Sequence, residues 1–181
     1  MNVVECIKSR RSVRDYSVKE VSSEIVSELI DCARHAPFGG PSDKKVCQPW
    51  EFIIIRNHET KAKLALSFDD RQFVASAPVI IAVLADTKRD PDYKVWESTT
   101  SLAIENILLS AHSLGLGACY VSTFMKHEKH KQDKEVLRSA LNLPEQVELV
   151  ALITLGFPKE NAEIKQKNLR SLEEIIHDEK W

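Results

Sequence analysis

The stretch that decides the fold class is Val79-Ile80-Ile81-Ala82-Val83-Leu84-Ala85, an uninterrupted apolar run rich in β-branched residues. Such a run favours a strand that is buried on both faces. The run from Leu149 to Leu155 has the same character, and Trp50 to Ile55 and Ala118 to Val121 are two shorter strand candidates. A sheet with two buried faces needs helices on both sides. We therefore expect an α+β fold with three layers.

Four other segments have apolar residues at helical spacing and are predicted to be helices. They are Val3 to Ser9, a segment that begins at Ser22 or Ser23 and ends before Pro37, Trp96 to Leu114, and Asp133 to Leu141. In the third of these segments the apolar positions go nearly all the way round the helix, which indicates a central helix.

The bulk composition excludes several classes of protein. The chain has 181 residues and a formal net charge of -2, which favours one domain over residues 1–181 and argues against a nucleic acid or an anionic membrane as the main partner. No stretch is long enough to span a bilayer, and the N-terminus has no apolar signal region, so we expect a cytoplasmic protein. Four scattered cysteines without a C-x-x-C pair give no zinc motif.

The first chemically informative motif is the basic run Arg10-Arg11-Ser12-Val13-Arg14, which directly follows the first predicted helix. Guanidinium groups offer planar forks of charged donors that match phosphate oxygens, and a serine hydroxyl adds a neutral donor. A basic run by itself is more often a solvated surface. Its meaning therefore depends on other motifs in the chain.

Four motifs, in this order, resemble those of the nitroreductase family of flavoproteins. They are Arg10-Arg11-Ser12-Val13-Arg14, Ala36-Pro37 followed by Gln48-Pro49-Trp50, Gly115-Leu116-Gly117 before a strand, and Gly156-Phe157-Pro158 followed by Leu172-Glu173-Glu174 and Glu179-Lys180-Trp181. Each motif is common, but their combination in this order is specific. The resemblance covers the chain to its last residue and implies a three-layer α/β/α fold around a central mixed, mainly antiparallel sheet.

The same resemblance implies an enzymatic function. Family members are FMN-dependent oxidoreductases that take electrons from NADH or NADPH and pass them to nitroaromatic, quinone or related acceptors by a ping-pong mechanism. They form homodimers with two flavin sites built from both chains. We therefore expect a homodimer in which the C-terminal segment, about residues 157–181, extends over the partner subunit.

Candidate site residues follow from the resemblance in three groups. The phosphate group comprises Arg10, Arg11, Ser12 and Arg14, with Lys167 or Arg170 from the C-terminal segment. The segment Pro37-Phe38-Gly39 is expected at the edge of the isoalloxazine ring, and the backbone of Val121-Ser122-Thr123 on its other side. A main-chain N–H, that of Thr123 being one candidate, is expected near flavin N5. No catalytic side chain is assigned, because the cofactor performs the hydride transfer.

One departure from the family pattern concerns the loop before Gln48. Relatives join the Ala-Pro turn to Q-P-W by a few small residues that include an Asn beside the flavin, whereas this chain inserts Phe38 to Cys47. Gln48 is a candidate substitute for that Asn, and a surface amide is an equally good interpretation. The longer loop is expected to reshape the substrate entrance.

Rival interpretations of single motifs have weaker support. Gly115-Leu116-Gly117 follows a predicted helix and precedes a strand, which is the reverse of a dinucleotide-binding motif. His127 and His130 lack a third metal ligand, so we expect no metal. Two functional alternatives stay open: another flavin chemistry on the same fold, such as reductive dehalogenation or flavin breakdown, and a flavin-binding or regulatory protein with weak turnover.

Overall fold

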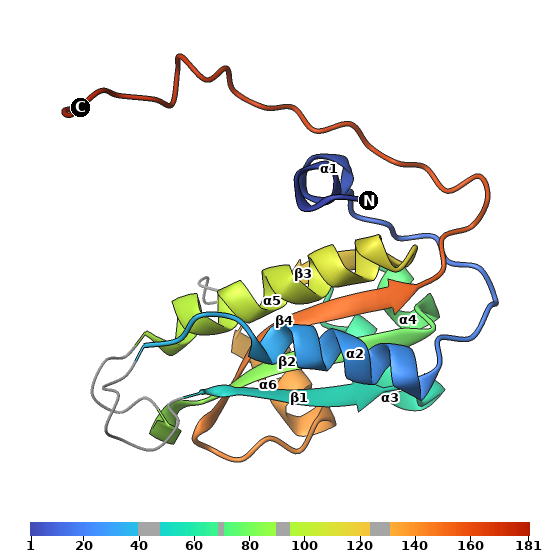
Figure 1. Cartoon of the computed structure of the whole chain (residues 1–181). Coiled ribbons are helices and arrows are strands. Elements are labelled where there is room, and N and C mark those ends of the chain that lie inside the picture. Colours follow the sequence, from blue (N-terminus) through green and yellow to red (C-terminus); the bar gives the residue numbers. More distant parts are fainter. Residues whose placement is uncertain (40–47, 69–70, 90–94, 124–130) are drawn as a thin grey trace.

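The computed structural model describes residues 1–39, 48–68, 71–89, 95–123 and 131–181 (Figure 1). Its elements in chain order are α1 Val3–Ser9, α2 Ser23–Arg34, β1 Trp50–Ile55, α3 His58–Ala65, α4 Phe73–Ser76, β2 Val79–Asp86, the 3-10 turn η1 Thr87–Arg89, α5 Trp96–Ser113, β3 Gly117–Ser122, α6 Lys131–Ala140 and β4 Val147–Gly156. The predicted helices and strands are all present, and the sequence reasoning had missed α3 and α4.

The strands form one four-stranded sheet in the order β1-β2-β4-β3, with every neighbouring pair antiparallel. The central pair places Ile81 opposite Ile153, and Tyr120 lies opposite Ile153 on the other side of β4. A parallel bridge joins Ser12 to Ala118 at the β3 edge. The predicted mainly antiparallel sheet is confirmed: its four strands are antiparallel, and the mixed character is limited to this isolated parallel bridge.

The two faces of the sheet bury two separate apolar clusters. Ile81 belongs to the cluster that includes α2 and α5, and Ile80 belongs to the cluster that includes α3 and α6. Both side chains are fully buried, with 0% exposure, because successive residues of a strand point to opposite faces. Two buried faces explain the continuous apolar run of β2 and confirm the three-layer arrangement.

Helix α5 is covered on one side and open on the other. Ala103, Ile107 and Ala111 are fully buried, whereas Leu102 is 46% exposed. Within one chain, the apolar residues around this helix are therefore only partly buried. Figure 1 shows α5 running along the sheet beside α2, with α1 on its outer side.

The chain after β4 contains neither helix nor strand. It leaves the sheet, passes α1 and ends far from the body of the domain (Figure 1). Its apolar side chains are exposed, among them Leu169, Leu172, Ile176 and Trp181. The extended course is compatible with the expectation for residues 157–181, and their contact with a partner stays a prediction.

Candidate functional site

The loop that carries the basic run is held against the start of β3. The backbone N–H of Arg10 donates to Cys6 O at 3.0 Å, which ends α1, and Val13 N–H donates to Ala118 O at 3.0 Å. Gly117 permits this approach, because a Cβ atom at that position would lie 2.7 Å from Val13 Cβ. The second glycine of the Gly115-Leu116-Gly117 motif therefore serves to position the basic run.

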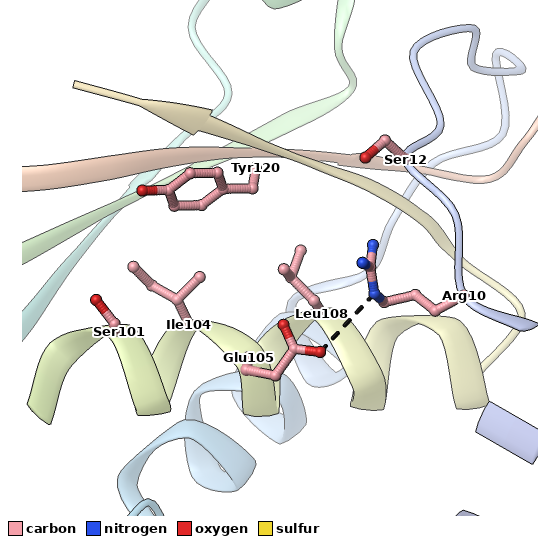
Figure 2. A pocket seen from close by; sticks show the side chains of 7 residues that line it. All are labelled: Arg10, Ser12, Ser101, Ile104, Glu105, Leu108 and Tyr120. Atoms are coloured by element: carbon pink, nitrogen blue, oxygen red, sulfur yellow. Dashed lines mark ion pairs between the residues drawn. The ribbon is translucent and has the colours of Figure 1, made fainter. Parts of the chain in front are cut away.

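This loop forms one end of a pocket between α5 and β3 with a volume of about 370 Å³. That volume falls within the range of about 300–1,000 Å³ typical of ligand sites. The residues that line it are Arg10, Ser12, Ser101, Ile104, Glu105, Leu108 and Tyr120. Figure 2 shows the cationic and hydroxyl groups of Arg10 and Ser12 at one end and Ser101 with the Tyr120 ring at the other. The pocket thus joins an anion-binding end to an apolar and aromatic wall.

Two side chains of opposite charge, Arg10 and Glu105, lie near the anion-binding end of the pocket. Arg10 Nε lies 3.9 Å from Glu105 Oε1, and the side chains are 19% and 51% exposed. The two outer nitrogens of the guanidinium point away from Glu105, toward the side of the pocket where Ser12 lies (Figure 2). These nitrogens can present a donor fork to an anion.

The other predicted phosphate ligands have separate surroundings. Arg11 turns back to the end of α1, where it donates to Lys8 O at 2.8 Å, and Lys167 donates to Ile7 O at 3.5 Å. The Arg14 guanidinium lies 5.5 Å from the centre of the Phe73 ring. Arg170 donates to Glu174 O within the C-terminal segment. Of this group, the structure brings Arg10 and Ser12 into one pocket and leaves Arg11 and Lys167 beside α1.

His112, which sequence reasoning did not select, lies at the C-terminal end of α5, next to Ser9 of α1. Its Nε2 is 2.8 Å from Ser9 Oγ, and the Ser9 hydroxyl donates to Glu5 O at 2.6 Å. Ser9 Oγ can accept a hydrogen bond from the ring when Nε2 carries the proton. Burial lowers the pKa of His112, and the charges of Arg10, Arg11 and Lys167 lower it further. Cations from two parts of the chain, the basic run and the C-terminal segment, therefore lie near this imidazole.

The predicted ring-edge residues border a different hollow. Phe38 packs edge-on against Trp50, with 5.9 Å between ring centres, and Gln48 Nε2 donates to Arg34 O at 3.4 Å. Phe38 and Gln48 line a cavity of about 340 Å³ together with Arg34, His35 and Ala36. Pro37 and Gly39 are exposed beside it. Within one chain, the ring-edge group and the Arg10 pocket are therefore separate.

Two of the residues predicted on the other side of the ring, Val121 and Thr123, direct their side chains into the domain. Val121 is 1% exposed and belongs to the α3 and α6 cluster, and Thr123 Oγ1 donates to Leu149 O at 2.7 Å. Ser122 is half-buried. Their expected backbone roles stay predictions. From β3 the pocket receives Tyr120 instead, which the alternation of strand residues after Ala118 could have identified.

Two sequence features lie outside the described residues: residues 40–47 of the insertion, and the segment that contains His127 and His130. Within the described part of the chain, no group of three metal-ligating side chains is present. Across the same residues, no helix is long and apolar enough to cross a membrane.

Fold and pocket together define an α+β domain with a hollow in which Arg10 and Ser12 can receive a small anionic ligand. The sequence profile of the nitroreductase family matches residues 7–71 and 66–157. A protein of Archaeoglobus fulgidus, provisionally named an NADH dehydrogenase/NAD(P)H nitroreductase, is 34% identical over 181 residues, covering 98% of this chain and 99% of its own. The chain therefore belongs to the nitroreductase family, as the order of its motifs indicated.

Solved structures agree with this assignment. A provisionally named nitroreductase of Desulfovibrio desulfuricans in complex with FMN has a TM-score of 0.82 and 29% identity, covering 100% of this chain and 98% of that one. An FMN-dependent nitroreductase of Clostridium difficile has a TM-score of 0.79 and 25% identity, covering 98% and 99%. The likeness extends over the whole chain, including the extended C-terminal segment.

Proposed function

We propose that this protein is an FMN-dependent oxidoreductase that uses NADH or NADPH to reduce a nitroaromatic, quinone or related organic acceptor. The observation that carries the proposal is the pocket in which Arg10 and Ser12 adjoin an apolar wall. FMN has the matching order of groups, with a phosphate dianion at one end and an aromatic ring at the other. Family membership and the FMN complex of a relative support the same cofactor.

In this proposal each part of the pocket has a distinct role. Arg10 and Ser12 bind the phosphate, and Lys167, on the same side of α5, adds positive charge. Ile104, Leu108 and Tyr120 provide the apolar and aromatic wall that would contact the rest of the cofactor. When bound, FMN supplies the hydride chemistry at its N5, so the protein needs to bind and orient rather than to provide a nucleophile.

A ping-pong order follows from the use of one site by both substrates. The nicotinamide donor and the acceptor both need access to the same face of the cofactor, so one must leave before the other enters. The pocket is open enough for such exchange, since Glu105 and Tyr120 in its wall are 51% and 40% exposed. Parallel double-reciprocal plots in steady-state kinetics are the expected result.

We further propose a homodimer that completes two such sites. Apolar residues remain exposed on α1, on α5 and along the C-terminal segment, among them Val3, Leu102, Leu172 and Ile176. Because the Arg10 pocket and the Phe38 hollow are separate within one chain, a second chain is the natural source of ring-edge contacts. A cytoplasmic location is also proposed, and the thiols Cys6, Cys32 and Cys119, which form no disulfide, are compatible with a reducing compartment.

The visible spectrum of the purified protein and its consumption of NAD(P)H test the proposal. We expect a yellow protein, or a colourless one that binds added FMN, and NAD(P)H oxidation that accelerates when a quinone such as menadione is added. A protein that binds flavin without acceptor-dependent oxidation is a binding or regulatory module instead. A colourless protein that also fails to bind added FMN contradicts the central claim.

A further inference from the structure

Glu105 is an unexpected residue in a pocket that receives a phosphate dianion. It projects from α5 into the hollow that contains Arg10 and Ser12 (Figure 2). Among the seven lining residues, Arg10 and Glu105 are the two that carry a formal charge at neutral pH. The lining is therefore neutral as a whole, although the basic run suggests a strongly cationic site.

The Arg10–Glu105 pair has the geometry of an exchangeable contact. The Nε–Oε1 distance of 3.9 Å exceeds the roughly 2.7–2.9 Å of a charge-assisted hydrogen bond between such groups. The carboxylate contacts the Nε edge of the guanidinium, whose outer nitrogens are directed elsewhere. Arg10 is the more buried partner, at 19% exposure, so it gains most from a counter-charge when no anion is bound.

We propose that Glu105 is the counter-charge of Arg10 in the flavin-free protein, and that the cofactor phosphate replaces it as the main partner of Arg10 on binding. This inference rests on the proposed FMN function. The carboxylate stays in the hollow after the phosphate binds and repels it. Glu105 thereby lowers FMN affinity and keeps the cofactor exchangeable.

The pocket is small enough for the Glu105 carboxylate to repel a bound phosphate measurably. A sphere of about 370 Å³ is about 9 Å across, which is comparable to the Debye length of about 8–10 Å at moderate salt. A charge of -1 and a charge of about -2 separated by about 7–8 Å in a water-like dielectric correspond to a change in affinity of about 3- to 10-fold. Removing the Glu105 charge is expected to tighten FMN binding by that factor.

The test compares Glu105→Gln with Glu97→Gln in flavin-free protein. Glu97 is an exposed residue in the first turn of the same helix and lies outside the pocket lining, so its variant has the same change in net charge. Titrations followed by flavin fluorescence use FMN and, as a phosphate-free probe, riboflavin. For Glu105→Gln we expect FMN to bind about 3- to 10-fold tighter at low salt and less so at high salt, with riboflavin unchanged. Glu97→Gln leaves both affinities unchanged.

Three results overturn the inference: unchanged or weaker FMN binding by Glu105→Gln, an equal gain for riboflavin, or an equal gain in Glu97→Gln. Glu105→Ala repeats the comparison with a second uncharged side chain, and thermal unfolding verifies that each variant is folded. Wild-type protein that binds neither flavin contradicts the proposed function itself. Wild-type protein that binds FMN with the same affinity as Glu105→Gln contradicts only the role of Glu105.

Discussion

Replacement of Arg10 by alanine is the sharpest test of the pocket. The outer nitrogens of this guanidinium are directed into the pocket, and its side chain is 19% exposed. Each charge-assisted hydrogen bond contributes about 1.5–3 kcal/mol, so the loss of one or two bonds costs about 1.5–6 kcal/mol, or at least about 10-fold in FMN affinity. The carboxylate of Glu105 is left without its cation in the variant, which favours the upper part of that range.

The assay is an FMN titration of flavin-free protein, with riboflavin as the phosphate-free comparison. Arg89→Ala serves as the matched control, because Arg89 pairs with Glu51 and Asp86 away from the pocket and its loss changes the net charge equally. Arg10→Lys keeps the charge without the fork and is expected to give an intermediate affinity. Wild-type FMN affinity in Arg10→Ala, or an equal loss in Arg89→Ala, would refute the assignment of the phosphate to this pocket.

Three further predictions concern the support of the site. Gly117→Ala places a Cβ 2.7 Å from Val13 and should lower the free energy of unfolding by about 1–3 kcal/mol in urea denaturation; an unchanged midpoint would contradict the close packing. Tyr16→Phe removes a buried hydroxyl that donates to Val13 O at 2.6 Å and lies 2.7 Å from Thr154 Oγ1, at a cost of about 1–3 kcal/mol; thermal stability equal to wild type would speak against it. The folded-state pKa of His112 is lowered below its unfolded value of about 6.5, so the unfolded chain binds the extra proton and stability falls as pH drops through about 6.5. His112→Gln should remove that part of the pH dependence. Unfolding curves of both proteins, measured on either side of about pH 6.5, test this.

The sequence predicted most of the secondary structure because local patterns specify it. The β-branched run at Val79 marks a strand with two buried faces, and Ser22 caps α2 by accepting from Ile25 N–H at 3.3 Å. The helices α3 and α4 escaped because α3 mixes polar and apolar residues with weak periodicity and α4 is only four residues long. Helix α5 was correctly identified as apolar on several sides, but which side is covered depends on neighbours that the sequence does not place.

The sequence by itself determined the family and the importance of the basic run, because four motifs in a specific order carry that information. The tertiary structure decided how the run divides: Arg10 and Ser12 line the pocket, Arg14 lies over Phe73, and Arg170 bonds within its own segment. It also brought Glu105 and His112 of α5 close to the basic run, from which they are distant in sequence. The physical reason is that packing of α1, α5 and β3 sets the direction of each side chain, whereas residue order specifies only which chemical groups are present.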